Sequence, residues 1–558
     1  MQKIRKTIDF VLNRGILAWM AVAFVWYMIV STLHRVISCD EGYYLMGFLV
    51  GQNVDGQATN FHYITRALCR PFADDNIMVF RHVRLAWTVF ALIVFALSSF
   101  EWLSRRKGLP ISRWAYYPMM ALAGAMSFTF AAPTLSYDSI ETIIALFVAS
   151  LLFVQLTSRR ENVKLLCAFG IGFLLWFSFT NSPPAGCGLA VLFAGIFFVN
   201  ADENKWKSLL FAFLGMVSAL VVHHLIVQDL RVWFSDISKI LVSTFTEKSG
   251  TGHDTESLIP GLLRTIGSLF VVLVPVVVLS TLFFRKVRLP EWLLWSVTLA
   301  LCVYLVVFRK EYELRGMLFM LPVALMLGKK LSQPDVNFGE YLISKDFWTA
   351  FALVAIPLAG VFGTNQGITN KAVIFTPFWM MSYFLLASRV EERQAVRLHV
   401  VFTVMLLGGY VYLGSFQRYH CYYTPRSSRC EIIGASRPQR VLVSEYQQQY
   451  YKDVFDSLRF AGCEAGDLYM AFGENQMAVY LAGGFISGRL VYHDVQYKTF
   501  DAEAPKAFIL FRIEEDGVIA RFRKTTWGFP ETYRRMEMRQ MSQNMSDEYR
   551  TVIYVKNN

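Results

Sequence analysis

The chain has 558 residues, of which 55% are hydrophobic and only 17% are charged. A water-soluble protein of this size could not bury that much apolar surface, and apolar runs long enough to cross a bilayer recur along the chain. Composition therefore excludes a soluble globular protein and predicts a polytopic membrane protein, in which the net charge of +12 reflects membrane topology and not nucleic-acid binding.

The first predicted element is an apolar run near residues 15–36, which follows a basic N-terminal segment. No small-residue cleavage site accompanies it, so we interpret this run as a retained membrane span and not as a signal peptide. Further runs bring the prediction to about thirteen transmembrane helices. The others lie near residues 82–103, 114–132, 139–157, 162–180, 184–200, 208–228, 261–284, 291–308, 314–328, 346–363, 372–388 and 396–416.

The distribution of Lys and Arg predicts how these helices are oriented. With the N-terminus in the cytoplasm, basic residues concentrate in the segments that then lie inside, among them "RRKGLPISR" and "SRVEERQAVR". Membrane proteins carry such an excess on the cytoplasmic side. The outer side then holds two long loops, residues 37–81 and 229–260, and an odd number of spans places the C-terminus there too. Loops of this length are usually functional or bind partners.

The C-terminal part of the chain differs in composition from the rest. Residues 1–416 predict an all-α membrane domain, and residues 417–558 are more polar and predict a small extracytoplasmic α/β domain. The segments "RVLVSEY", "DLYMAF", "KAFILFRI" and "TVIYVK" are typical of short buried strands. The segments "YYKDVFDSLRFAG" and "NQMAVYLAGG" are typical of helices that end at glycine.

Five cysteines fall in the predicted outer segments, namely Cys39 and Cys69 in the first loop and Cys421, Cys430 and Cys463 in the C-terminal domain. An oxidising compartment would permit disulfides there. We expect a Cys39–Cys69 pair in the loop and a Cys421–Cys430 pair in the domain, although connectivity does not follow from sequence alone.

Polar side chains with potential chemistry gather on the predicted outer face. They are Asp40 and Glu41 after the first span, Tyr137 and Asp138 in "PTLSYDS", His253, Asp254 and Glu256 in "TGHDTESL", Arg309, Lys310, Tyr312 and Arg315 in "FRKEYELRG", and Asn365 and Lys371 in "FGTNQGITNK". Acidic residues on one loop and a basic cluster on another, at one membrane surface, favour an active site that handles a phosphate.

The acidic pair in "DEGYY", directly past the first of about thirteen spans, resembles the GT-C superfamily of membrane glycosyltransferases, which includes the lipid A aminoarabinose transferases and the protein O-mannosyltransferases. The resemblance covers most of the chain. It implies an enzyme that moves a sugar from a polyprenyl-phosphate donor to a lipid, glycan or protein acceptor on the outer face, as in modification of cell-envelope glycans or lipopolysaccharide. By this match Asp40 is the catalytic candidate, with Glu41 beside it.

Other segments extend the resemblance less completely. "FRKEYELRG" resembles the basic turn that contacts the donor phosphate, and "SYDS" resembles the outer start of the fourth helix in related bacterial transferases. The aminoarabinose transferases carry a Lys-Pro-Pro segment in the first loop, for which the nearest match here is "NFHYITRALCRPF". The candidates for substrate binding are therefore His62, Arg66, Tyr137, Asp138, His253 and Asn365.

The implied reaction makes two physical demands. A positioned carboxylate, Asp40, takes the proton of the acceptor hydroxyl, and cationic side chains hold the departing phosphate. A single direct displacement inverts the anomeric configuration. We expect no cofactor; a divalent metal between Asp40, Glu41 and the phosphate is the alternative, and a monophosphate donor gives less reason for one.

Several alternatives remain open at this point. Asp40 and Glu41 are also suited to the first turn of an interfacial helix, Asp138 to a helix cap, Arg309, Lys310 and Arg315 to snorkelling anchors, and Asn365 to a turn. The rival functions are a transporter or flippase of lipid-linked sugars and a non-catalytic membrane scaffold. A single Asn-x-Ser sequon at Asn544 gives little reason for a secretory pathway, so we expect a bacterial inner membrane with a periplasmic active site.

Overall fold

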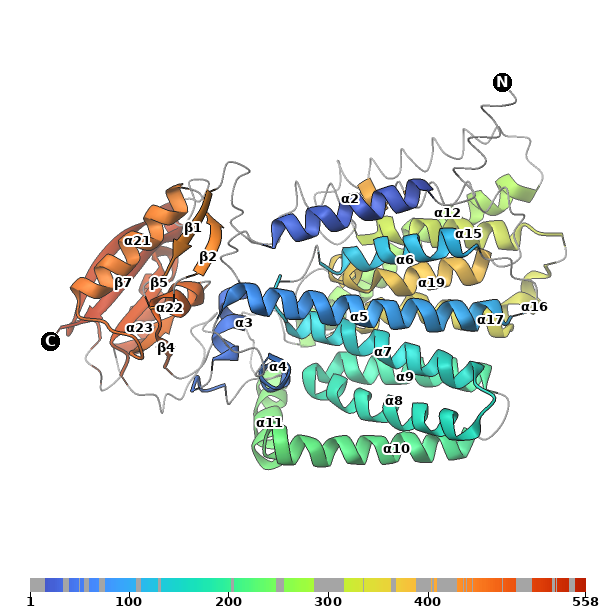
Figure 1. Cartoon of the computed structure of the whole chain (residues 1–558), viewed down its shortest axis with the longest axis horizontal. Helices are drawn as coiled ribbons and strands as arrows, with labels where there is room; N and C mark the ends of the chain where they lie inside the picture. Colours follow the sequence, from blue (N-terminus) through green and yellow to red (C-terminus); the bar gives the residue numbers. More distant parts are fainter. Residues whose placement is uncertain are drawn as a thin grey trace, which may run out of the picture.

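The structure is a computed structural model of the chain, and the helices form one elongated bundle with a smaller domain at one end (Figure 1). It describes residues 16–33, 40–49, 51–54, 60–69, 76–106, 112–128, 132–201, 205–246, 255–285, 316–334, 336–362, 368–387, 403, 406–408, 429–434, 436–437, 439–443, 445–473, 475–487, 504–523, 527, 529–540 and 547–557.

The bundle consists of apolar helices that overlap the predicted spans. They are α2 (Ile16–Thr32), α5 (Ile77–Ser104), α6 (Arg113–Met126), α7 (Tyr137–Thr157), α8 (Glu161–Asn181), α9 (Pro183–Asn200), α10 (Lys205–Val222) with its π-helical extension η2 (His223–Val227), α12 (Thr255–Arg285), α15 (Leu321–Leu331), α17 (Lys345–Ala359) and α19 (Thr376–Ala387). Short 3-10 turns, η4 (Gly316–Phe319) and η5 (Ala372–Phe375), precede α15 and α19.

Six helices of the described part are long and apolar enough to cross a membrane: α5, α7, α8, α9, α10 with η2, and the Thr265–Arg285 part of α12. The chain is therefore mostly helical and has the character of a membrane protein, while the expected total of about thirteen spans is not confirmed. The predicted span near residues 291–308 lies outside the described residues, as does most of the one near 396–416.

The two segments predicted as long loops contain helices. The first holds α3 (Asp40–Phe48) and α4 (Phe61–Cys69), and the second holds α11 (Leu230–Thr246). These three helices lie at the same end of the bundle as the C-terminal domain, whereas α16 (Phe338–Leu342) lies at the other (Figure 1). We call the first the domain-facing end and the second the opposite end.

Helix α5 begins earlier than hydropathy predicts, because a polar side chain caps it. The Asn76 side chain accepts a hydrogen bond of 2.8 Å from the backbone N–H of Met78, so the helix starts at Ile77. The extra turn places Arg81 inside the helix, on the same face as Arg84 three residues later. Both side chains are thereby directed into the protein at the domain-facing end.

The C-terminal domain is built on a five-stranded sheet with the order β4-β3-β5-β7-β6. Its strands are β3 (Leu468–Ala471), β4 (Phe485–Ile486), β5 (Ala507–Phe511), β6 (Tyr533–Gln540) and β7 (Arg550–Lys556). Strands β4, β3 and β5 run parallel, β7 pairs antiparallel with β5, and β6 pairs antiparallel with β7. The sequence "AFILF" of β5 is buried throughout, as suits a central strand.

Helices and a second small sheet complete this domain. They are α21 (Glu445–Phe460), α22 (Gln476–Ala482), α23 (Glu515–Phe522), and the antiparallel pair β1 (Arg429–Ile433) and β2 (Gln439–Val443). Helix α22 ends, as predicted, at a glycine: Gly483 has a φ of 85°, which favours glycine over all other residues. The predicted strands and helices of this domain are confirmed, and β1, β4, β6 and α23 are additions to the prediction.

The predicted disulfides stay predictions. Cys39 and Cys421 lie outside the described residues, and the side chains of Cys69 and Cys430 do too. Among the described cysteines, Cys167, Cys187 and Cys463 carry free thiols.

Candidate functional site

The acidic pair opens the short helix α3 at the domain-facing end. Asp40 is the first residue of α3 and Glu41 is the second. The Glu41 side chain is fully buried, and its Oε1 and Oε2 accept hydrogen bonds of 2.8 Å and 2.6 Å from Nε and Nη2 of Arg81. Burial raises the pKa of the Glu41 carboxyl, and the charge and hydrogen bonds of Arg81 oppose that rise. Such a two-point pair fixes the start of α3 against α5.

The second arginine of α5 extends this cluster toward α7. Arg84 is buried and donates hydrogen bonds to the backbone carbonyls of Ser127, at 2.7 Å, and Ala132. Its guanidinium lies 4.6 Å from the centre of the Phe128 ring. It also interacts electrostatically with both Glu41 and Asp138. Arg84 therefore links Glu41 of α3 to Asp138 at the start of α7.

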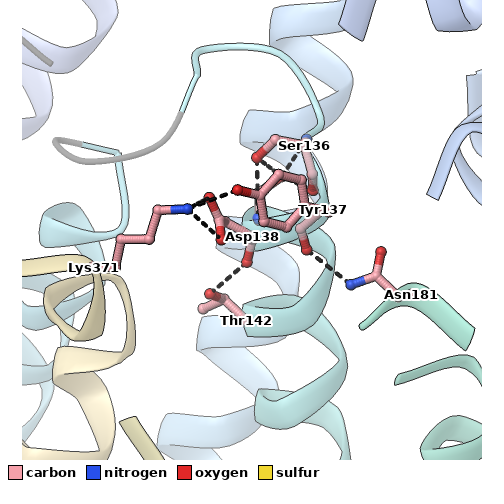
Figure 2. Close-up of polar contacts among 7 residues, drawn as sticks. Ser136, Tyr137, Asp138, Thr142, Asn181 and Lys371 are labelled. Atoms are coloured by element: carbon pink, nitrogen blue, oxygen red, sulfur yellow. Dashed lines mark hydrogen bonds and ion pairs between the residues drawn. The ribbon is translucent and has the colours of Figure 1, made fainter. Parts of the chain in front are cut away.

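A second buried ion pair lies at the start of α7, where Lys371 of the short helix α18 (Ile368–Lys371) reaches Asp138 (Figure 2). The Lys371 Nζ lies 3.2 Å from Asp138 Oδ2 and donates a hydrogen bond of 2.7 Å to the Tyr137 hydroxyl. The same Nζ is 4.9 Å from the centre of the Tyr137 ring. Lys371 thus contacts both Tyr137 and Asp138.

The cap of α7 is a different residue from the one that sequence suggested as an alternative. Ser136 is the N-cap, and it exchanges hydrogen bonds with Ser139 in a capping box. Asp138 stands in the first turn of the helix, with its carboxylate turned to Lys371 (Figure 2). Its role is therefore that of an ion-pair partner, and the helix-cap interpretation of Asp138 is wrong.

A third acid lies one turn further into the bundle. Glu141 is buried and accepts hydrogen bonds from the Ser178 hydroxyl and, at 2.8 Å, from the Asn181 amide. The same amide donates to the backbone carbonyl of Tyr137 at 2.9 Å (Figure 2). Asn181 thereby ties Glu141 to the first turn of α7. An ionisable residue within an apolar span was the signal that could have identified Glu141 from sequence.

The other two candidates from the first outer segment, His62 and Arg66, lie in α4. His62 is buried, and its Nε2 is 3.0 Å from the Tyr43 hydroxyl. Its Nδ1 is buried without a hydrogen-bond partner in the described part of the chain. Burial, with a contribution from the charge of Arg66, holds the pKa of His62 well below its usual range. This side chain is therefore neutral at pH 7.

Arg66 contacts the protein backbone. Its Nε donates a hydrogen bond of 2.7 Å to the carbonyl of Gly47, and its Nη2 donates one of 2.6 Å to the carbonyl of Gln52. Arg66 thus fastens the end of α3 to the segment that follows it. This geometry favours a structural role over the predicted substrate contact.

The structure brings together Glu41, Tyr137, Asp138 and Lys371, all among the polar residues expected on the outer face, and adds Arg81, Arg84, Glu141 and Asn181. Arg309, Lys310, Tyr312, Arg315, His253 and Asn365 lie outside the described residues, so their roles stay predictions. Within the described ranges, no group of three or more His, Cys, Asp or Glu side chains is arranged to hold a metal ion.

Comparison with known proteins adds no assignment: no protein-family model matches the chain, and no curated protein matches it. The chemical character of the site therefore comes from its residues alone. Three carboxylates and three cations, all buried at one end of an apolar bundle, form a region where charges interact more strongly than they do in water. Such a region suits a reaction in which charge moves between oxygen atoms.

Proposed function

We propose that the chain is an integral-membrane glycosyltransferase of the GT-C type. It moves a sugar from a polyprenyl-phosphate donor to an acceptor hydroxyl on the outer face of the membrane. The observation that carries this proposal is the position of α3. Helix α3, which begins with Asp40 and Glu41, is fixed at the domain-facing end of the bundle, beside the buried pair of Asp138 and Lys371.

The two acids of α3 have different roles in this proposal. Both oxygens of Glu41 accept hydrogen bonds from Arg81, so Glu41 could not take up a proton without disrupting that pair. Glu41 is therefore a positioning residue, and Asp40 is the general base. A well-placed base contributes about 10²–10⁴ to the rate.

The reaction is a single displacement. The acceptor oxygen forms a bond to the anomeric carbon while its proton passes to Asp40. The bond between that carbon and the phosphate oxygen breaks, and its electron pair leaves with the lipid phosphate. Arg309 and Lys310 are assigned to this phosphate by the family resemblance. Cations at a water-poor surface stabilise the negative charge that develops there.

The main rival function is a transporter of lipid-linked sugars, and one observation favours it. Glu141 is a buried acid within α7, one of the helices that are suited to cross the membrane. Transporters use such residues near the middle of the bilayer. Glu141, however, lies just beyond the first turn of α7 and close to Asp138, at the rim of the bundle. This position fits a surface active site better than a central transport path.

A transfer assay tests the proposal. The purified chain in lipid nanodiscs is incubated with a panel of polyprenyl-phosphate sugars and hydroxyl acceptors, and Asp40→Asn is compared with the wild type. We expect turnover to fall on the order of 10² or more, with donor binding retained. Glu101→Gln is the matched control, because Glu101 is an exposed acid that pairs with Arg105 at the opposite end.

Two results would contradict this assignment. Near-wild-type turnover of Asp40→Asn would remove Asp40 as the base and leave its helix-terminus role standing. Movement of labelled lipid-linked sugar across the bilayer, with no transfer from any donor, would establish the rival function.

A further inference from the structure

We propose that the C-terminal domain positions the acidic helix α3, and that Gln52 is the central positioning residue of this joint. The joint consists of Gly42, Gln52 and Arg66 on the membrane-domain side and of Met477 and Ile486 on the C-terminal domain. Its existence does not depend on any activity. Its effect on catalysis rests on the function proposed above.

Gln52 joins the edge of the C-terminal sheet. Its Nε2 donates a hydrogen bond of 2.9 Å to the backbone carbonyl of Ile486, and its Oε1 accepts one of 2.7 Å from the backbone N–H of the same residue. Ile486 belongs to β4, the edge strand of the five-stranded sheet. The Gln52 amide therefore satisfies both backbone groups of one residue on an edge that would otherwise be open. Both residues are buried, so both hydrogen bonds are shielded from water.

Arg66 connects Gln52 to α3. It donates one hydrogen bond to the carbonyl of Gln52 and another to the carbonyl of Gly47, near the end of α3. Gly51, just before Gln52, has a φ of 93°, a conformation that favours glycine. An added Cβ there would lie 3.7 Å from the Phe485 ring, so the turn passes directly over β4. The end of α3 and the edge strand are thus held by one connected set of contacts.

A second attachment lies at the other end of α3. A Cβ added to Gly42 would lie 2.3 Å from the backbone nitrogen of Met477 and 2.8 Å from its Cα. The backbones of α3 and α22 are therefore in direct contact, and only glycine fits at this position. Gly42 immediately follows Glu41, so this contact lies one residue from the buried ion pair.

The domain also contacts the helix that carries the partner of Glu41. The side-chain oxygen of Gln439 accepts a hydrogen bond of 2.9 Å from the backbone N–H of Ile77, the first residue of α5. The C-terminal domain thus contacts both α3, which carries Glu41, and α5, which carries Arg81. The Glu41–Arg81 pair depends on the distance between α3 and α5, and the C-terminal domain contacts both of these helices. This coincidence is what points to a positioning role.

Hydrogen exchange of the full-length chain in nanodiscs tests the joint. Gln52→Met keeps the length of the side chain but removes both hydrogen bonds to Ile486, and Gly42→Ala forces α3 away from α22. We expect the amides of residues 40–48 to exchange about tenfold faster or more in each variant, because two buried hydrogen bonds or one close backbone contact are lost.

Two matched controls separate this effect from a general loss of stability. Gly195→Ala changes a helical glycine of α9 whose added Cβ meets no atom within 4 Å, and Gln449→Met changes an exposed glutamine on α21. Both should leave exchange in α3 unchanged. The two test variants act through different contacts, so either one decides the question if the other fails to fold.

Steady-state kinetics then test the catalytic part. We expect kcat of Gln52→Met to fall about tenfold or more with the donor KM unchanged, because a small displacement of a reacting group costs rate more than binding. Unchanged α3 exchange in both variants would overturn the joint. Faster α3 exchange with unchanged kcat would overturn its positioning role. A wild type without transferase activity would overturn the proposed function, and the exchange data would still decide the joint.

Discussion

Helix α5 has an arginine ion pair at each end, and the two pairs differ in their exposure to solvent. At the domain-facing end, Arg81 is fully buried and pairs with the fully buried Glu41. At the opposite end, the side chains of Arg105 and Glu101 pair while 51% and 53% exposed. The two ends of one helix therefore allow a buried ion pair to be compared with an exposed ion pair of the same kind.

The difference supports the proposal that the functional site lies at the domain-facing end. An exposed pair contributes little to stability and is sufficient to anchor a helix end at a membrane surface. A buried pair must overcome the loss of hydration of both ions, so it is a poor way to gain stability. Two such pairs, Glu41–Arg81 and Asp138–Lys371, occur at the domain-facing end. Their presence is better explained by a functional site than by anchoring.

The largest expected effect concerns the sides of the membrane on which the two ends lie. Single cysteines are placed at the exposed positions Asp516 in the C-terminal domain and Lys345 at the start of α17, in a variant without native cysteines. We expect a membrane-impermeant maleimide to label Asp516→Cys from outside the cell, and Lys345→Cys after the membrane is opened. Labelling of both cysteines from the same side would contradict the placement of the two ends on opposite sides of the membrane.

The next effect is on stability. Arg81→Met leaves Glu41 buried without its partner, and breaking a buried pair in this way costs about 3–5 kcal/mol. Arg105→Met removes an exposed pair and should cost about 0–1 kcal/mol. Thermal unfolding of the two variants in the same detergent measures the difference.

A double variant sharpens this result. Glu41→Leu combined with Arg81→Met removes both charges and should recover most of the stability that Arg81→Met loses. The recovered protein should still lack activity if α3 serves catalysis. Equal losses for Arg81→Met and Arg105→Met would mean that burial of the first pair has no energetic consequence.

Sequence predicted the elements of this fold better than the residues of its site. Apolar runs and glycine stops gave α7, α8, α9 and α22 to within a few residues, because these signals depend on local composition. The helices α3, α4 and α11 lie in segments expected as loops, since polar and charged residues interrupt their apolar positions and leave no long apolar run. Helix α3 packs its backbone against α22 at Gly42 and Met477, a tertiary contact that no local sequence pattern predicts.

The site shows the same limit. Glu41 and Asp138 were identified by sequence, because acids beside apolar runs are unusual. Hydropathy places Arg81 at the end of a loop. Its pairing with Glu41 depends on the start of α5 at Ile77, after the cap Asn76, which hydropathy does not predict. Lys371 and Asp138 are separated by more than half of the membrane domain in sequence, and no local pattern reveals that they pair.

The smallest expected effect concerns pH. His62 at the domain-facing end has a pKa held well below 6.5 by burial, so the folded protein keeps this ring neutral. The unfolded chain binds a proton at His62 near pH 6.5, so it takes up more protons than the folded state below that pH. Stability should therefore be complete above about pH 6.5 and should fall as the pH drops below it, by about 1 kcal/mol over the first unit.

Replacement of the ring tests this contribution. His62→Gln should reduce the loss of stability between pH 6.5 and 5.5 by about that 1 kcal/mol, whatever its effect at pH 7.5. His82→Gln, which removes an exposed histidine of α5, controls for the loss of a histidine as such. Unfolding midpoints measured across this range give the two slopes. An unchanged slope for His62→Gln would show that His62 is protonated in the folded state, and that the domain-facing end admits more water than its buried charges imply.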